Sequence, residues 1–460
     1  MVFSSPVFLF MFLPATVLLY HLPIFKSIQY KNILLLIASL LFYAWGEPVF
    51  VFVMLLSIFI NWIAGLLIPR YGKAAMLSAV IFDVGLLFVC KYLTFVLKTI
   101  FNPTGMQSVA FSISLPIGIS FFTFQIISYV VDVYRKQAPI QRNPVNLALY
   151  ISMFPQLIAG PIVRYASIDE QLQKRTTSSA DVAYGIRRFT VGLGKKLLIA
   201  NYMGIVADNL FGMTGQLSTM AAWYGVICYA FQIYFDFSGY SDMAIGLGRI
   251  FGFHFEENFR YPYTAKSVVD FWRRWHISLS TWFRDYVYIP LGGNRVSKYR
   301  WLLNYFIVWM LTGIWHGANW TFFLWGFYYF TLLTLEKLTG IQQKLRRGYR
   351  FATLLFILLG WVLFRSDSLY MAQQYLRSMF TVSAHGFTDF VFFQQLGTSY
   401  PVLILAAVGS TPLCKMLFER LKMKDALKQC LLFASTVLLF LLSLLVSISS
   451  THNPFLYFNF

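Results

Sequence analysis

Two histidines, His316 and His276, are the side chains of this sequence best suited to group-transfer chemistry. His316 stands in the segment LTGIWHGANW, between apolar runs at 301–315 and 320–335. An ionisable side chain at such a depth in apolar sequence is costly, which makes it a candidate for function. Burial favours the neutral imidazole, which can take a proton from a hydroxyl that attacks an acyl group. The alternative is a histidine that only forms hydrogen bonds between helices.

The residues next to His316 in the sequence are of types that commonly line a pocket. Gly313 and Gly317 would let backbone or ligand approach closely, and Trp315 and Trp320 would form walls. The sequence contains no GxSxG segment and no cysteine beside a histidine. These features favour a histidine base over a serine or cysteine nucleophile.

His276 lies in the segment 255–300, which is too polar to span a bilayer. Apolar residues recur there every three or four positions, at Val268, Trp272, Trp275, Leu279 and Trp282. Charged residues fall on the opposite face, at Asp270, Arg273, Arg274 and Arg284. The pattern predicts an amphipathic helix at the membrane surface. His276 falls between the two faces, where it would either share a site with His316 or be an interfacial side chain without chemistry.

A third group of polar residues interrupts the apolar run 229–254, at Asp236, Ser238, Ser241 and Asp242. Carboxylates in such a run need an ionic partner or a cavity. Two interpretations stay open, an ion pair with another helix and a substrate-binding role for Asp236, Ser238 and Asp242. Arg249 follows Asp242 by two helical turns and is one possible partner.

The amino-acid composition indicates that membrane-spanning helices position these residues. Hydrophobic residues make up 58% of the 460, and charged residues only 12%, whereas soluble domains carry about 25% charged residues. The bilayer must therefore be the solvent, and runs such as 74–90, 351–364 and 429–449 are long and apolar enough to span it as helices. We expect an all-α polytopic membrane protein with about 11–12 transmembrane helices, forming one domain over 1–460. Transmembrane β-strands would alternate apolar and polar residues, and these runs do not.

The net charge of +19 comes from lysines and arginines in short segments between apolar runs. This is the positive-inside pattern, so we expect no binding of nucleic acid. It predicts that 135–144 and 415–428 face the cytoplasm and that 212–220 lies outside. Residues 6–25 lack a preceding basic region and are expected to be a retained span.

Two further expectations concern irregular segments and cysteines. Pro155, Gly160 and Pro161 interrupt the segment 154–165, which predicts a re-entrant hairpin buried in protein or lining a cavity. The four cysteines are scattered, so we expect buried thiols and no metal site or disulfide framework.

Three long motifs, in this order, resemble the membrane-bound O-acyltransferase family. They are FDFSGYSDMAIGLGRIFGF, FWRRWHISLSTWFRDYVYIPLGGNR and LTGIWHGANWTFFLWGFYY. The segments SLPIGISFFTFQIISYVVDVYR, FPQLIAGPIVRY and the terminal NPFLYFNF are similar to the bacterial alginate O-acetyltransferase branch of that family. The resemblance covers nearly the whole chain.

The resemblance implies a ring of tilted helices around a funnel, in the bacterial inner membrane. His316 matches the catalytic histidine of the family, as general base or acyl relay, and His276 matches its second polar position. The implied donor substrate is cytoplasmic acetyl-CoA, with no bound cofactor. The implied acceptor is an exported polysaccharide, reached with a periplasmic or extracellular acyltransferase partner. On this basis we expect substrate-binding roles for Asp236, Ser238, Asp242, Trp315, Asn319, Arg273 and Arg274.

Arg273 and Arg274 would attract the phosphates of coenzyme A, or would only anchor the chain to anionic membrane lipid. A teichoic-acid type D-alanyl transferase with a carrier protein is one alternative to the acetyl branch. A transporter or flippase is an alternative of another class, because broken helices and intramembrane acids are typical of transporters too. The sequence leaves the acceptor polysaccharide open.

Overall fold

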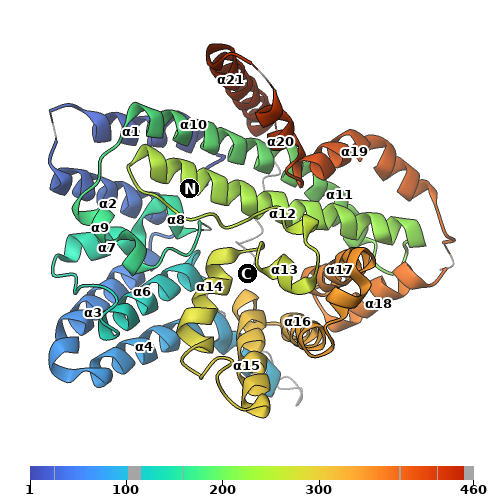
Figure 1. Cartoon of the computed structure of the whole chain (residues 1–460), viewed down its shortest axis with the longest axis horizontal. Coiled ribbons are helices and arrows are strands. Elements are labelled where there is room, and N and C mark those ends of the chain that lie inside the picture. The colour runs from blue at the N-terminus through green and yellow to red at the C-terminus, as the bar shows by residue number, and fades with distance from the viewer. Residues whose placement is uncertain (25, 102–114, 159, 383–384, 422, 450–460) are drawn as a thin grey trace. The chain divides into compact units, whose positions relative to one another are not determined.

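A computed structural model describes residues 1–460 except 25, 102–114, 159, 383–384, 422 and 450–460 (Figure 1). Over the described residues the chain is helical and has no β-strand, which confirms the predicted all-α class. The chain forms two compact units, Met1–Phe189 with Ser241–Glu256, and Thr190–Tyr240 with Glu257–Phe460. The NPFLYFNF motif lies outside the described residues, and the single domain over 1–460 stays a prediction.

The first unit is built from the N-terminal helices. They are α1 (Leu13–His21), α2 (Ile28–Ala44), α3 (Phe50–Tyr71), α4 (Lys73–Leu87), α5 (Leu93–Phe101), α6 (Ile119–Tyr134), α7 (Pro144–Ser152), α8 (Phe154–Leu157), α9 (Tyr165–Gln173) and most of α10 (Ser179–Gly194). Helices α3, α4 and α6 pack side by side (Figure 1). Asp83 of α4 is buried among them, where it accepts hydrogen bonds from Ser57 and Asn61 of α3, both at 2.9 Å. One oxygen of this intramembrane carboxyl group is thus hydrogen-bonded by the neighbouring helix α3.

The segment 154–165 is irregular, as its prolines and glycine predict. Helix α7 ends at Ser152, α8 covers only Phe154–Leu157, and α9 begins at Tyr165. The side chains of Phe154, Leu157 and Ile162 are buried. Tyr150 donates a hydrogen bond to the carbonyl of Val163 at 2.8 Å, which satisfies part of the non-helical backbone. The predicted burial holds for these side chains, and the re-entrant course of the segment stays a prediction.

The second unit carries the residues with catalytic potential. Its elements are the π-helical turn η4 (Lys195–Ala200), α11 (Asn201–Gly212), most of α12 (Thr219–Ile250), the 3-10 turn η5 (Pro262–Thr264), α13 (Val268–Trp272), α14 (Ile277–Phe283), the π-helical turn η6 (Arg284–Tyr288), α15 (Lys298–His316), α16 (Trp320–Thr339), α17 (Ile341–Arg365), α18 (Leu369–Phe380), α19 (Phe390–Gly409), α20 (Leu413–Arg420) and α21 (Asp425–Ser449). Helix α16 packs between α15 and α17.

Small residues let α15 and α16 approach each other closely. A Cβ atom on Gly313 of α15 would meet the carbonyl oxygen of Phe322, and one on Gly326 of α16 would meet the carbonyl oxygen of Trp309. Such close contact between helix backbones is typical of membrane helix pairs. The pair therefore forms a rigid support for the residues that project from α15, including His316.

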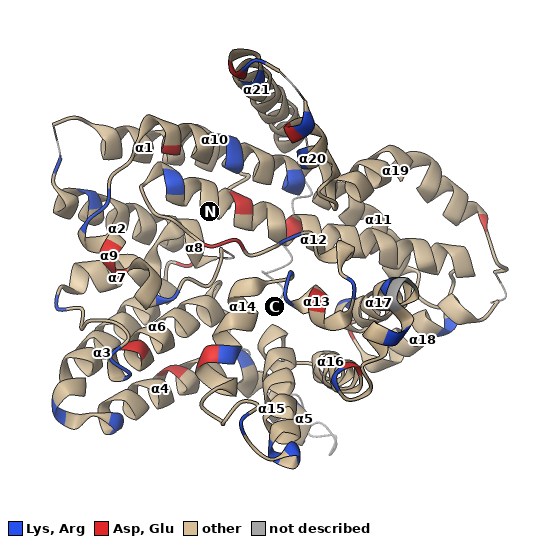
Figure 2. Ribbon diagram, viewed as in Figure 1, with Lys and Arg blue, Asp and Glu red and all other residues tan. Residues whose placement is uncertain are grey.

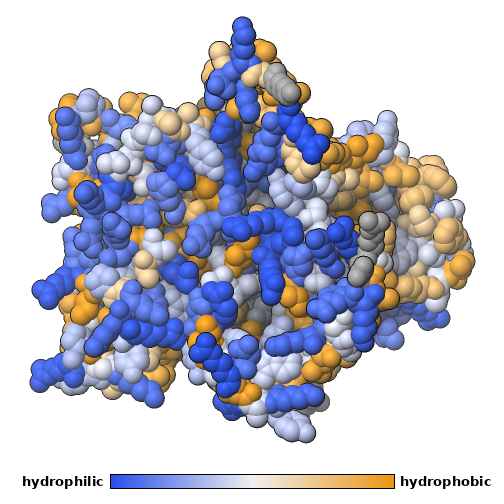
Figure 3. Space-filling view, viewed as in Figure 1, coloured by the Kyte–Doolittle hydropathy of each residue, from blue (hydrophilic) through white to orange (hydrophobic). Residues whose placement is uncertain are grey.

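The predicted spans are present as helices. Five described segments are long and apolar enough to cross a membrane: Phe50–Tyr71, Lys73–Ile100, Gly348–Arg365, Phe390–Gly409 and Asp425–Ser449. Lysines and arginines gather at helix ends and connecting segments, while most of each ribbon is uncharged (Figure 2). Hydrophobic residues gather on the surface over α19 (Figure 3), where Phe390, Phe393 and Ile404 are exposed. The chain is a multi-pass membrane protein, and the number of 11–12 spans stays a prediction.

The charges of the loops predict which loops face the cytoplasm, and cysteine labelling can test this orientation. In a variant without its native cysteines, Gln216→Cys is expected to react with an impermeant thiol reagent added to intact cells. Ile140→Cys is expected to react only after the cells are opened, because basic loops stay on the cytoplasmic side. Gel-shift labelling of both variants measures this. The reverse pattern, with position 140 labelled in intact cells and 216 shielded, would overturn the orientation.

Candidate active site

The segment that carries His276 is two short helices rather than the single amphipathic helix expected from the periodicity. Helix α13 ends at Trp272 and α14 begins at Ile277. His276 lies between them with φ of 45°, in the left-handed region that is costly for a residue with a Cβ atom. The apolar face also packs into protein rather than lipid, since Val268, Trp275 and Leu279 are buried. The 3.6-residue period continues through the break, so the pattern alone does not reveal it.

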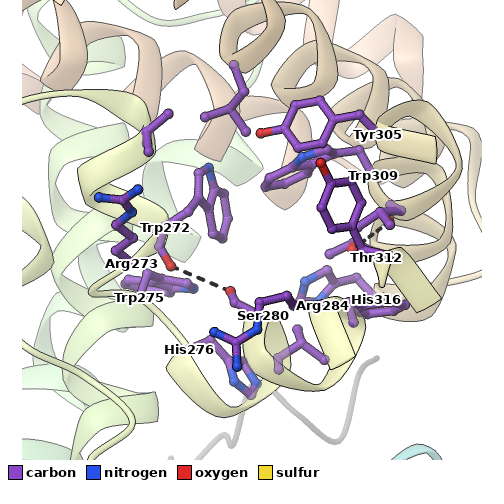
Figure 4. A pocket seen from close by; sticks show the side chains of 16 residues that line it. Trp272, Arg273, Trp275, His276, Ser280, Arg284, Tyr305, Trp309, Thr312 and His316 are labelled. Atoms are coloured by element: carbon purple, nitrogen blue, oxygen red, sulfur yellow. Dashed lines mark hydrogen bonds between the residues drawn. The ribbon is translucent and has the colours of Figure 1, made fainter. Parts of the chain in front are cut away.

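A cavity of about 280 Å³ lies between these short helices and α15 (Figure 4). Its lining is mostly apolar and aromatic, and it includes two histidines, two arginines and four hydroxyl side chains. The lining residues are Val269, Trp272, Arg273, Trp275, His276, Leu279, Ser280, Phe283, Arg284, Tyr288, Tyr305, Val308, Trp309, Thr312, His316 and Leu333. An apolar cavity with a few convergent polar groups is the usual form of a small-molecule site.

One face of α15 forms a continuous wall of this cavity. Tyr305, Trp309, Thr312 and His316 follow each other at helical spacing and all line it. From Tyr305 to His316 the helix rises about 16 Å, at about 1.5 Å per residue. The cavity is thus elongated along the helix axis. Tyr305, Trp309 and Thr312 were not among the predicted site residues, although their helical spacing from His316 was a signal for them.

His316 is the last residue of α15 and is only 5% exposed. Aromatic rings surround its imidazole, with ring centroids 4.9 Å away at Phe364 and 5.2 Å away at Trp325. Trp315 packs edge-on against it at 4.9 Å. These contacts fix the ring in one orientation, as a catalytic group requires.

His276 lines the same cavity and is 3% exposed. Its ring lies 6.0 Å from that of Trp315, so the Trp315 side chain packs against both imidazoles. Burial lowers the pKa of His276 to about 3, which makes this imidazole neutral near pH 7. His276 and His316 thus line one cavity, which favours the shared site over the interfacial interpretation, and the catalytic role of His276 stays a prediction.

The two candidate arginines of this segment have different surroundings. Arg273 lines the cavity, together with Arg284. Arg274 instead forms an ion pair with Asp270, with Nε to Oδ1 at 2.8 Å, and is absent from the cavity lining described above. Arg273 is therefore the better placed of the two to meet an anionic ligand.

The acidic candidates on α12 form ion pairs with basic residues of neighbouring segments. Lys196 of η4 contacts Asp236 at 2.7 Å, and both side chains are at most 5% exposed. Arg188 of α10 contacts Asp242 at 2.7 Å. Arg249 pairs with Asp181 at 3.1 Å, not with Asp242. Asp236 and Asp242 thus each have a basic partner, as the ion-pair interpretation requires.

The other two polar candidates have structural contacts as well. Ser238 is buried within α12 and does not appear among the described lining residues. Asn319 accepts a hydrogen bond from the Thr321 amide as the N-cap of α16, and its own amide donates to the carbonyl of Asp367. The structure therefore brings His316, His276 and Arg273 to one cavity, and Trp315 packs against both histidines without being among the lining residues. The remaining candidates have ion-pair, capping or buried positions outside that lining.

Comparison with known proteins gives the same family as the motifs. The model of the membrane-bound O-acyltransferase family matches residues 133–382. A probable alginate O-acetylase of Pseudomonas syringae pv. tomato is 44% identical over 397 residues, covering 83% of this chain and 75% of the relative. A peptidoglycan O-acetyltransferase of Helicobacter pylori is 35% identical over 429 residues, covering 82% and 80%.

A more distant relative covers less of the chain. A teichoic acid D-alanyltransferase of Bacillus subtilis is 34% identical over 236 residues, which is 47% of this chain and 58% of the relative. The matched family segment contains the whole cavity lining, from Val269 to Leu333. This chain is an O-acyltransferase that belongs to the membrane-bound O-acyltransferase family.

Proposed function

We propose that the chain transfers acetyl groups from cytoplasmic acetyl-CoA to hydroxyls of an exported polysaccharide, as a multi-pass protein of the bacterial inner membrane. The relatives that cover more than four fifths of the chain are named for acetyl transfer to alginate or peptidoglycan. The D-alanyl relative covers less than half of it. The acetyl group reaches the polymer directly or through a periplasmic or extracellular acyltransferase partner.

The observation that carries the proposal is that His316 and His276 line one elongated cavity with an arginine. Arg273 and Tyr305 line this cavity, and Tyr305 lies about 16 Å along α15 from His316. A cavity that is lined by arginines and a histidine base and extends about 16 Å along α15 suits a phosphorylated donor with a long arm and a terminal thioester. The volume of about 280 Å³ is at the lower limit for a drug-sized ligand, so the nucleotide part of coenzyme A would lie outside.

In this proposal His316 acts as the general base. It takes the proton of an acceptor hydroxyl, whose oxygen attacks the thioester carbonyl carbon. The new C–O bond forms, the C–S bond breaks, and the proton passes from His316 to the departing thiolate of coenzyme A. In a relay version, a His316 nitrogen attacks the thioester carbonyl carbon, the C–S bond breaks, and the departing thiolate takes the proton of the imidazole. The acceptor hydroxyl then attacks the acyl-histidine, the C–N bond breaks, and the hydroxyl proton returns to the imidazole. His276, neutral and buried, would orient the reacting groups.

Thioester turnover by the purified protein tests this function. Protein in lipid nanodiscs is expected to release the coenzyme A thiol from acetyl-CoA and to acetylate an added oligosaccharide. A transporter or flippase would leave the thioester intact. Turnover of a D-alanyl carrier protein with no turnover of acetyl-CoA would favour the D-alanyl alternative and overturn the proposed donor.

The two arginines provide a matched pair for the donor site. Arg273→Ala is expected to raise the donor KM about tenfold, a loss of about 1.4 kcal/mol, because Arg273 lines the cavity. Arg274→Ala is expected to change the KM little, because a half-exposed ion pair such as Arg274–Asp270 contributes little. Steady-state kinetics with acetyl-CoA measures both. Unchanged KM in Arg273→Ala would leave both arginines as lipid anchors.

A further inference from the structure

A fully buried carboxylate, Glu336, lies next to the segment that forms one wall of the cavity. Glu336 belongs to the last turns of α16 and is 0% exposed. Its two oxygens accept hydrogen bonds from the backbone N–H groups of Val268, at 2.6 Å, and Val269, at 3.0 Å. A carboxylate far along the chain thus caps the start of α13.

Helix α13 depends on this contact because it is very short. It has five residues, Val268–Trp272, whereas an isolated helix needs roughly 12–15 residues to be even marginally stable in water. Its first N–H groups have no partner within the helix. Glu336 binds two of them and the Ser267 hydroxyl binds the third, that of Asp270, at 3.0 Å. Ionised acceptors at a helix N-terminus form the stronger kind of hydrogen bond.

Helix α13 positions the part of the cavity wall that we propose meets the acyl donor. Trp272 and Arg273 both line the cavity. Trp272 packs edge-on against Trp309 and Tyr329, with ring centroids 5.1 and 4.8 Å away. His276, in its left-handed conformation, lies between the end of α13 at Trp272 and the start of α14 at Ile277. If the start of α13 loosened, the arginine and the tryptophan would lose their fixed positions along the wall.

We propose that Glu336 is a positioning residue for the acyl donor. Glu336 caps α13 and so holds Trp272 and Arg273 in fixed positions opposite α15. The inference rests on the proposed acetyl-CoA donor and deepens it. Glu336 itself is absent from the described cavity lining, so it acts through α13 and not on the substrate.

Glu336→Gln is the sharpest substitution, because it keeps the size of the side chain. The amide offers one acceptor oxygen and one NH₂ donor, which would face a backbone N–H where two acceptors are required. We expect faster hydrogen exchange in the peptide that contains the Val268 and Val269 amides. We also expect a donor KM at least tenfold higher, with a smaller change in kcat.

Two matched variants separate positioning from general stability. Tyr349→Phe removes a buried hydroxyl of α17 and leaves both backbone contacts of Glu336, so its exchange and KM should be close to those of the wild type. Asp83→Asn alters a buried polar cluster of the first unit and should lower the melting temperature without changing the donor KM. If Glu336→Gln likewise lowers only the melting temperature, Glu336 is a structural residue and the proposal is wrong.

The measurements also separate this inference from the proposed function. If the wild type turns over no acetyl-CoA, the proposed donor is wrong, and the donor-positioning role falls with it. If the wild type is active and Glu336→Gln has a wild-type KM, or unchanged exchange at Val268 and Val269, only the role of Glu336 is overturned.

Discussion

His316→Ala is expected to abolish acetyl transfer while the protein still inserts and purifies. Insertion depends on long apolar helices, five of which are identified by length and hydropathy alone, and one imidazole hardly changes them. The chemistry is different, because an alcohol needs a base in order to attack a thioester near pH 7. A positioned general base contributes about 10²–10⁴-fold to the rate. Acetylation of an oligosaccharide by the purified variant, together with its melting temperature, measures both effects.

His316→Gln is the control for packing. The glutamine side chain fills much of the space among Phe364, Trp325 and Trp315 and keeps hydrogen-bonding capacity. It cannot accept the proton near pH 7. We expect it to recover any stability lost in His316→Ala without recovering activity. An active His316→Gln enzyme would show that His316 only packs between helices and would sink its catalytic assignment.

The second large effect concerns the buried ion pair of Lys196 and Asp236. Lys196→Met is expected to destabilise the protein by about 3–5 kcal/mol, because it leaves the carboxylate of Asp236 buried without its cation. The same loss is expected for Asp236→Leu, which leaves the ammonium group buried. Thermal unfolding in detergent, followed by tryptophan fluorescence, measures the change in stability.

The double variant Lys196→Met with Asp236→Leu distinguishes an ion pair from a substrate site. Apolar side chains of similar volume can replace a buried pair at little cost, so the double variant should regain most of the stability lost in either single variant. Its donor KM should equal that of the wild type if Asp236 only pairs with Lys196. A stable double variant with weakened substrate binding would instead restore the substrate-binding interpretation of Asp236.

The interrupted helix at His276 shows which features the apolar periodicity predicts and which it does not. The apolar spacing from Val268 to Trp282 correctly grouped residues that face the protein core, and Val268, Trp275 and Trp282 are all buried. It missed the left-handed residue between α13 and α14. A local repeat is unchanged when one backbone angle changes sign and the next helix restarts close to the same register, so the sequence pattern carries no trace of the break.

Hydropathy determined the helical membrane fold, because apolar runs in lipid must satisfy their backbone groups internally. Depth in such a run also singled out His316, and the family motifs singled out His276. Only the tertiary structure decided which partners the buried charges have. Asp236 pairs with Lys196 across 40 positions, and Glu336 caps a helix that begins 68 positions earlier. Local propensity extends over a few residues, whereas ion pairs, remote caps and cavity walls depend on which helices pack together. The sequence therefore specified the membrane helices and the reactive side chains, and the packing of α13, α15 and α16 decided the shape of the cavity they share.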